Sequence, residues 1–268
     1  MIHKLDVDMV VVMSDIHAGS SYGLMPKRQI VHGGQVITPN ALQKWLLACW
    51  RDFWEWADIT TDGCKWAFVL DGDAIEGMHH CTTEVISADV GDHKAAAIEL
   101  LAPIAERADA FYMIEGTECH TANIEHSIGK ALGAAKCHMG SGHVLDAWPQ
   151  LAVSVNGCFG IIRHHIGTTT RPYLEATQLG VQLNVDRLEC MRAGMPQPKF
   201  LVSAHRHQYG DYSDGDAVSV VCPPWQGLTR HGRKVVPAAT TRVGGIILDF
   251  REAGPDQKPR LMDRIYKP

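Results

Sequence analysis

The stretch VVVMSDIH, residues 10–17, decides the fold that the sequence predicts. It belongs to an apolar run over residues 9–13, which is typical of a strand buried on both faces. The run breaks directly into two polar residues, Asp15 and His17. A tryptophan-rich segment at 40–57, NALQKWLLACWRDFWEWA, follows with apolar residues on helical spacing, and we expect it to pack in the core. A buried strand followed by such a helix favours an α/β fold.

The same unit repeats through the first half of the chain. Strands are expected at 66–70 and 111–114, and helices at 92–108 and 123–134, with Pro103 expected to kink the first of these helices. This alternation implies parallel strands whose carboxyl ends share one edge of a sheet, where such folds place their sites.

The second half has a different rhythm. Asn156-Gly157 joins two short apolar runs and predicts a hairpin, and Asp214-Gly215 predicts another turn. A helix is expected at 171–191. Later strands are expected in KFLVSAHRH (199–207), AVSVVCPPWQ (217–226) and RVGGIILDF (242–250). This half leans towards antiparallel pairing, and we expect a single domain over residues 1–268 with two packed sheets.

The composition is that of an ordinary globular protein, with 46% hydrophobic and 21% charged residues. A net charge of -5 argues against a broad nucleic-acid-binding face. The 8 cysteines form no C-x-x-C pair, which favours reduced thiols in a cytosolic protein. The sequence shows no signal-peptide pattern and no run of transmembrane length, so we expect a cytoplasmic protein without a membrane partner.

Polar residues of metal-binding type follow five of the apolar strands. They are Asp15 and His17; Asp73; the turn GTECH at 116–120; His164 and His165; and His205 and His207. Residues two apart on an extended segment project on the same side, so Asp15 and His17 face one way, and so do His205 and His207. A mixed set of carboxylates and imidazoles suits Mn²⁺, Fe or Zn²⁺ better than Ca²⁺ or Mg²⁺. The sequence therefore predicts a metal centre.

In this order the motifs resemble those of the calcineurin-like metallophosphoesterase family. The family pattern is D-x-H, G-D, G-N-H-[DE], a strand-end His and G-H-x-H. The corresponding stretches here are SDIH, LDGD, EGTECH, IIRHH and SAHRH. The resemblance implies a four-layer α/β/β/α sandwich of two mixed sheets flanked by helices.

The resemblance also implies two divalent metal ions, with Mn²⁺ expected first and Fe or Zn²⁺ as alternatives. Asp15, His17 and His207 would hold one ion, and Asp73 would bridge to the other. His205 and either His164 or His165 would bind that second ion; only one of the pair should face it if the strand alternation continues, and we lean slightly to His165.

The third motif departs from the family pattern. Thr117 stands where the family has an Asn ligand, and Glu118 stands where it has a His that assists the leaving group. We expect GTECH to be a rewired wall of the site. In it Thr117 would touch metal through its hydroxyl or a water, His120 would serve as ligand or acid, and Glu118 would bind metal or orient a neighbour. The other interpretation is an ordinary helix-entry turn with His120 on the surface.

The function implied is hydrolysis of a phosphate mono- or diester by in-line attack of a hydroxide shared by two ions. The substrate would be a phosphate ester, with a nucleotide or a nucleic-acid end as one option. Candidates for substrate binding are Arg163, Arg171, Arg206, His79 and His80, together with the basic run TRHGRK at 229–234. Two alternatives stay open: a non-catalytic scaffold of the same fold, and a mononuclear metal hydrolase. The oligomeric state and the role of the 18–40 loop, as a lid or an oligomer contact, also stay open.

Overall fold

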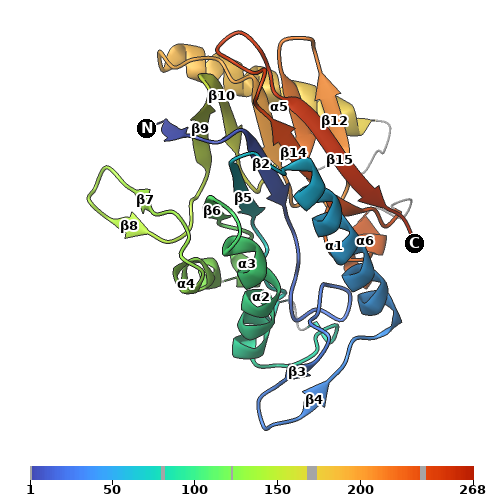
Figure 1. Cartoon of the computed structure of the whole chain (residues 1–268). Coiled ribbons are helices and arrows are strands. Elements are labelled where there is room, and N and C mark those ends of the chain that lie inside the picture. The colour runs from blue at the N-terminus through green and yellow to red at the C-terminus, as the bar shows by residue number, and fades with distance from the viewer. Residues whose placement is uncertain (1, 80–81, 122, 168–173, 236–239) are drawn as a thin grey trace.

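Two large mixed sheets pack face to face, and helices cover both outer faces (Figure 1). The structure is a computed structural model. It describes residues 2–79, 82–121, 123–167, 174–235 and 240–268. The predicted sandwich of two mixed sheets flanked by helices is confirmed.

The first sheet contains the three parallel strands that the sequence predicts. Its strand order is β15 (Arg260–Tyr266), β14 (Val243–Asp249), β2 (Met9–Met13), β5 (Trp66–Asp71) and β6 (Ala110–Ile114). Strands β2, β5 and β6 are parallel, and the register aligns Met13 with Leu70 and Leu70 with Met113. Since the three strands end at the same level, the polar residues that follow them emerge at one edge.

The second sheet is less antiparallel than predicted. Its strand order is β1 (His3–Leu5), β9 (Leu151–Val155), β10 (Cys158–Ile162), β11 (Phe200–Ser203), β13 (Val218–Val221) and β12 (Gly210–Ser213). The hairpin at Asn156-Gly157 joins β9 to β10, with both turn residues at positive φ, as predicted. However, β10 and β11 pair in parallel, because helix α5 connects them as a crossover.

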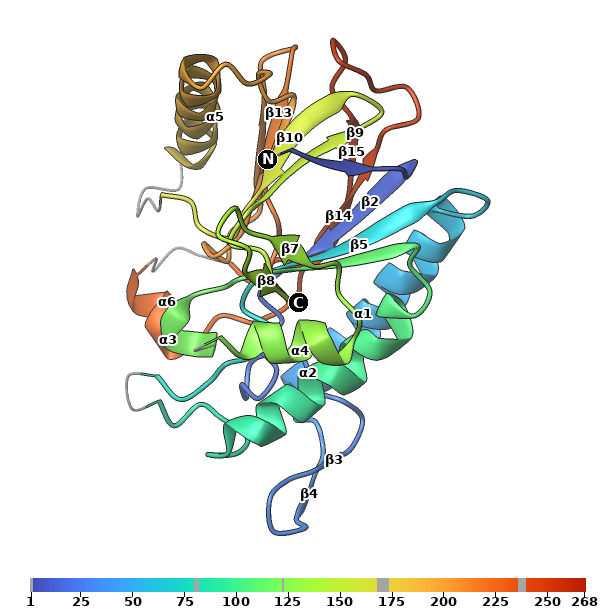
Figure 2. The same ribbon diagram turned by 90° about the vertical axis from the view of Figure 1, so that its left-hand side faces the viewer.

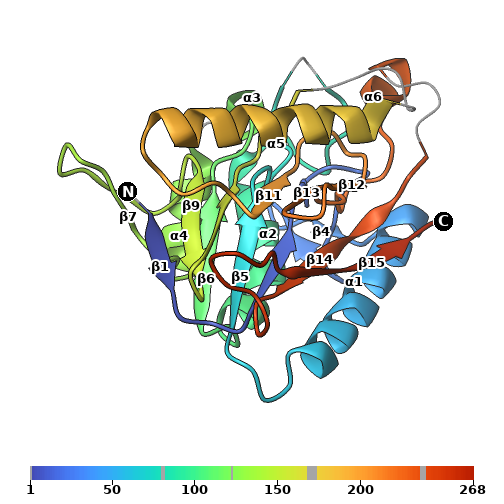
Figure 3. The same ribbon diagram turned by 90° about the horizontal axis from the view of Figure 1, so that it is seen from above.

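Helices form the two outer layers. On one side lie α1 (Ala41–Thr60), α2 (Val90–Ala105) and α4 (Ile124–Ala131), and on the other lies α5 (Glu175–Arg192), as Figures 2 and 3 show. Pro103 lies near the end of α2, where the helix stops two residues later. Among the described helices, none is long and apolar enough to cross a membrane.

Short elements make up the connections. The 18–40 loop contains a small hairpin of β3 (Gln29–Ile30) and β4 (Val36–Ile37), which projects away from the sheets in Figure 1. A second small hairpin joins β7 (Cys137–His138) and β8 (Val144–Leu145). Two short helices, α3 (Glu118–Thr121) and α6 (Arg230–Val235), complete the connections.

Alternation along β2 divides the core into layers. Met9, Val11 and Met13 pack in the cluster under α1 and α2, and Val10 and Val12 pack in the cluster between the sheets. This is why the run at 9–13 is apolar at every position: both faces of the strand are covered.

A third apolar cluster lies between the second sheet and α5, where Ile161 and Leu201 pack with Leu183 of the helix. Three apolar interfaces separate four layers, in the order helices, sheet, sheet, helix.

An ion pair ties α5 to the turn between β12 and β13. The guanidinium of Arg187 donates to both carboxylate oxygens of Asp214, and the backbone N–H groups of Ala217 and Asp216 donate to Oδ1. The Arg187 hydrogen bond, more than any other contact, lowers the pKa of Asp214 to about 2. A lowered pKa in the folded state stabilises the protein above the unfolded-state value of about 4, and that contribution is lost as the pH falls towards 2.

Asp214→Asn should therefore lower the free energy of unfolding by about 1 kcal/mol at pH 7, a value reduced for the exposure of this pair. The difference from wild type should shrink as the pH falls below about 4. Urea unfolding at a series of pH values measures it, with the exposed Asp211→Asn on β12 as the matched control. A difference that stays constant with pH would assign the loss to turn geometry rather than to charge.

Candidate metal centre

The polar segments predicted from the sequence meet at one edge of the two sheets. Backbone hydrogen bonds hold them side by side: Asp15 N–H donates to the Gly72 carbonyl at 3.2 Å, and Ala204 N–H donates to the His164 carbonyl at 2.9 Å. On one side of the centre, Asp15 Oδ1 and His17 Nε2 each lie 3.2 Å from His207 Nε2. These three side chains form one group of potential ligand atoms.

Asp73 lies between this group and a second one. Its Oδ2 is 3.7 Å from His17 Nε2 on one side and 3.1 Å from His164 Nε2 on the other. His164, His165 and His205 bring potential ligand nitrogens within 4.8 Å of one another. The arrangement is therefore two adjacent groups of potential ligands with one carboxylate between them.

Backbone strain is concentrated at these residues. Among the described residues, seven other than glycine have positive φ. Five of the seven are candidate ligands: Asp15 (50°), His17 (41°), Asp73 (46°), His205 (68°) and His207 (53°). Left-handed conformations cost a non-glycine residue about 1–2 kcal/mol each. The strained residues are the candidate ligands that directly follow the strands. Strain concentrated at such positions indicates a functional site.

Two glycines allow the segments to approach closely. A Cβ on Gly116 would lie 2.2 Å from the backbone nitrogen of Asp73, and a Cβ on Gly72 would lie 2.3 Å from His164 Nδ1. Gly72 also has a φ of 75°. Any side chain at either position would displace a candidate ligand.

The charges of the centre compensate one another at short range. Asp15 and Asp73 are 0% and 1% exposed. Burial alone would raise the pKa of Asp73, but the neighbouring His164 and His17 together outweigh burial and hold the pKa far below its usual range. Burial alone would lower the pKa of His164, but the carboxylates of Asp73 and Asp15 raise it to about 10.

The donor set fits divalent cations. Asp15 Oδ1 is buried and accepts no hydrogen bond from any described residue, although imidazole nitrogens surround it. A cation bound here would replace imidazole protons as the counter-charge of the two carboxylates. Imidazole nitrogens with carboxylate oxygens are the ligands of Mn²⁺, Fe and Zn²⁺.

The geometry favours His164 over His165 as the ligand. His164 is buried, its Nδ1 donates to the backbone carbonyl of Asp71 at 2.7 Å, and its Nε2 faces Asp73 at 3.1 Å, where a cation could replace the Nε2 proton. His165 is exposed, although one of its nitrogens belongs to the same group of potential ligands. The slight preference for His165 is thus not supported. Strand alternation does not separate the two, because β10 ends at Ile162, before both.

Thr117 lies inside the centre. Its backbone N–H donates to Asp73 Oδ1 at 2.6 Å, and its hydroxyl is 3.2 Å from Asp73 Oδ2 and 3.0 Å from His205 Nδ1. Glu118, in contrast, is exposed and is absent from the described residues that line the cavity over the centre. The predicted role of Glu118 as a ligand or orienting group is therefore wrong for this arrangement, because α3 turns the side chain towards solvent.

His120 lies against the centre rather than on the open surface. Its Nδ1 donates to the backbone carbonyl of Glu76 at 2.9 Å, and its ring centroid is 4.9 Å from that of His17 and 4.0 Å from that of His79. Burial, with the charge of His17 adding to it, lowers the pKa of His120 to about 4. The neutral imidazole therefore has its proton on Nδ1 and a lone pair on Nε2.

Glu76 is a site residue that the motif comparison did not identify. It is 3% exposed, and its Oε2 lies 3.0 Å from His17 Nδ1. His79 Nε2 is 2.9 Å from Oε1, and the Gln226 amide donates to Oε2 at 2.6 Å. Glu76 thus fixes the ring of His17 from the side opposite Asp73. The sequence feature that could have identified Glu76 is its position as the single carboxylate three residues after Asp73 in an otherwise apolar segment.

A cavity of about 590 Å³ opens over the centre. Of the predicted substrate-binding residues, Arg206 and His79 line it. Arg163 does not line the cavity: both its terminal nitrogens pair with the carboxylate of Asp186, so it anchors α5 instead of binding phosphate. His80 and Arg171 lie outside the described residues.

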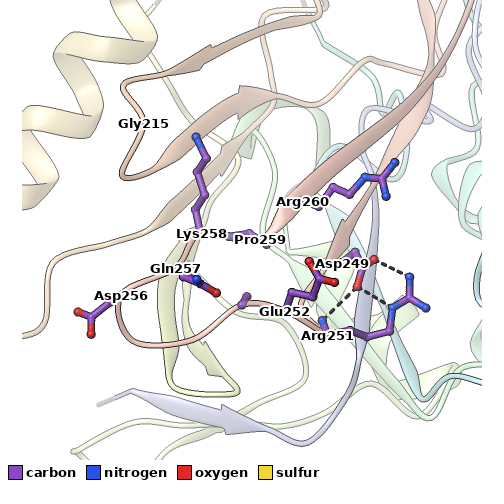
Figure 4. Close-up of a pocket in the computed structure, with 10 residues that line it drawn as sticks. Gly215, Asp249, Arg251, Glu252, Asp256, Gln257, Lys258, Pro259 and Arg260 are labelled. Atoms are coloured by element: carbon purple, nitrogen blue, oxygen red, sulfur yellow. Dashed lines mark hydrogen bonds and ion pairs between the residues drawn. The ribbon is translucent and has the colours of Figure 1, made fainter.

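A second hollow, of about 780 Å³, lies at the opposite end of the first sheet, beside the β14–β15 loop (Figure 4). The register places Asp249, at the end of β14, opposite Met9, at the start of β2. Arg251 is paired with Asp249 there, at 2.7 Å. No potential metal-ligand group of the described residues falls in this hollow.

No family model matches the sequence, and no curated protein matches it. Solved structures with similar folds include Vacuolar Protein Sorting 29 from Cryptosporidium parvum, at 13% identity and a TM-score of 0.42, covering 98% of this chain and 100% of that one. A novel archaeal phosphodiesterase is 10% identical with a TM-score of 0.42, over 96% and 99% of the two chains. A predicted phosphoesterase from Streptococcus pneumoniae is 8% identical with a TM-score of 0.36, over 98% and 99%. These similarities are too distant to carry a conclusion about activity.

Proposed function

We propose that the chain is a metal-dependent phosphoesterase with two divalent ions, of the calcineurin-like metallophosphoesterase type that its motifs resemble. One observation carries the proposal: residues from three separate segments form two adjacent donor groups around the buried Asp73 of a fourth, and Thr117 of a fifth segment contacts Asp73. Chance does not bring two buried carboxylates and five imidazoles to one edge, with both carboxylates and three of the imidazoles on residues of positive φ.

The expected ligands are Asp15, His17 and His207 for one ion, and His164, His205 and the hydroxyl of Thr117 for the other. Asp73 lies between the two groups. Such ions, when bound, activate a water and neutralise the oxygens of a phosphoryl group.

The chain's own residues supply orientation. Thr117 N–H and the position of Gly116 hold the Asp73 carboxylate in place, and Glu76 holds the ring of His17. Arg206 lines the cavity beside the ligands, where its planar fork can bind phosphate oxygens. His120 commits its Nδ1 proton to the Glu76 carbonyl, so at Nε2 it can accept a proton or bind a ligand. The sequence predicted that His120 serves as a metal ligand or as an acid. This tautomer has no proton on Nε2, so it favours the ligand role over the acid role.

The test is hydrolysis of bis-p-nitrophenyl phosphate and p-nitrophenyl phosphate by protein stripped of metal and reloaded with Mn²⁺. Bound metal is counted on the same sample. We expect Mn²⁺-dependent turnover with two ions per chain, and the preferred ester separates diesterase from monoesterase activity. Turnover with a single ion would favour the mononuclear hydrolase, whereas no ion and no turnover would overturn the enzyme hypothesis and favour the scaffold.

A further inference from the structure

We propose that the cavity binds a phosphate ester carrying a second phosphate group, which lies on a wall separate from the metal centre. This inference rests on the proposed function, because it adds a subsite to the same cavity. The subsite would be formed by Arg230, Lys234 and Arg242, which we call the basic wall.

The basic wall lines the same cavity as the candidate ligands His17, Asp73 and His205. It belongs to α6 and to the start of the segment that leads into β14, which are remote in sequence from the ligand-bearing loops. The chain as a whole is acidic, with a net charge of -5, so three cations on one wall are a local feature.

Two of these cations lack a counter-ion in the part of the chain that the structure describes. Arg230 Nε lies 3.3 Å from Glu84 Oε1, but neither Lys234 nor Arg242 has an acidic partner within 4.0 Å among the described residues. Arg242 is partly buried as well. A partly buried, unpaired guanidinium facing a cavity is suited to an anionic ligand, and arginine and lysine are the usual phosphate-binding residues.

The base of this wall is fixed to the metal centre. Trp225 N–H donates to the Asp15 carbonyl at 3.0 Å, Gly227 N–H donates to the Tyr22 carbonyl at 2.8 Å, and the Gln226 side chain donates to Glu76 at 2.6 Å. Leu228 N–H donates to Thr241 Oγ1 at 3.3 Å, and this hydrogen bond links the segments before and after α6. The wall is thus held against the ligand-bearing loops.

The phosphate at the metal centre would already be neutralised by cations and by Arg206, so the basic wall is in excess of what one phosphate requires. An ester with a further phosphate group would use it. A nucleoside bisphosphate and a phosphorylated oligonucleotide end share this chemistry.

The experiment compares pairs of ligands that differ by one phosphate. Binding of thymidine 3′,5′-bisphosphate and of thymidine 5′-phosphate to the Mn²⁺-loaded protein is measured by calorimetry. Turnover is measured with the p-nitrophenyl ester of thymidine 5′-phosphate, with and without a 3′-phosphate. We expect the second phosphate to improve both affinity and kcat/KM by about tenfold at low salt, and less at high salt.

The variant is the double substitution Lys234→Gln with Arg242→Gln, in which the ratio between the paired ligands should fall to about one. The matched control is Lys258→Gln with Arg260→Gln at the second hollow, which removes the same charge from the opposite end of the molecule (Figure 4). The control should keep the tenfold ratio. A further competitor, 5′-phosphorylated trithymidylate, identifies an oligonucleotide end if it binds more tightly than the bisphosphate, and a nucleotide if it does not.

A ratio of about one in the wild type would overturn the inference, as would an equal loss in the variant and its control. Equal turnover of both esters would leave the proposed function intact and remove the subsite. A tenfold binding preference that depends on the basic wall, without turnover of either ester, would keep the subsite and remove the esterase.

Discussion

Asp73→Asn should abolish metal binding at both donor groups and lower Mn²⁺-dependent kcat/KM by about 1,000-fold or more. The reason is position: Asp73 Oδ2 lies 3.7 Å from His17 and 3.1 Å from His164, so one carboxylate contacts both groups. An amide keeps the shape of this side chain but removes its negative charge, which is the attraction for two cations in a buried site. Metal counted by mass spectrometry and turnover of bis-p-nitrophenyl phosphate, on the same preparation, measure the effect.

The matched control for this variant is Asp256→Asn. Asp256 borders the second hollow at the opposite end of the molecule, so the same chemical change there should leave metal content and turnover unaltered (Figure 4). Circular dichroism checks that both variants are folded. Two bound ions and activity within tenfold of wild type in Asp73→Asn would contradict the assignment of Asp73 as the shared ligand.

Much of the fold follows from the sequence because β2 and β5 are buried on both faces. A strand that contacts helices on one side and a sheet on the other must be apolar throughout, and the runs at 9–13 and 66–70 show this directly. The pairing of β10 with β11 was harder to predict. The helix at 171–191 was predicted, but the sequence did not show that this helix crosses over between β10 and β11 and so makes the two strands parallel.

The candidate ligands were predictable for a related reason. Each follows an apolar strand, and parallel strands in register bring their ends to one edge. What the sequence did not predict depends on where loops turn. Arg163 pairs with Asp186, a residue of α5, and Glu118 faces solvent at the start of α3. Neither the partner of Arg163 nor the direction of the Glu118 side chain can be deduced from sequence spacing or composition.

The role of Glu76 could not be predicted from the sequence for the same reason. Its contact with His17 depends on the loop after β5 lying against the loop after β2, where His17 N–H donates to the Asp73 carbonyl at 3.1 Å. The sequence shows a carboxylate in that loop, but it does not show that this carboxylate contacts the imidazole of His17.

Thr117→Val tests the most unusual feature of the centre. Valine has nearly the shape of threonine and keeps the backbone N–H that donates to Asp73 Oδ1 at 2.6 Å. It removes the hydroxyl that lies 3.0 Å from His205 Nδ1 and 3.2 Å from Asp73 Oδ2. We expect affinity for the second ion to fall by about 10–100-fold, with kcat falling at limiting Mn²⁺ and partly recovering at high Mn²⁺. A titration of Mn²⁺ that follows bound metal and turnover together measures it.

Thr117→Ser is the matched control, because it keeps the hydroxyl and removes only a methyl group, and it should bind two ions as the wild type does. Thr117→Asn places a carbonyl oxygen at the same position and should bind the second ion at least as tightly as threonine. If valine binds two ions with unchanged affinity, the hydroxyl is not a ligand, and the turn acts through its backbone alone. The glycine at 116 would then be the reason for the motif, since only glycine lets the Thr117 N–H reach Asp73 without a Cβ 2.2 Å from the Asp73 backbone nitrogen.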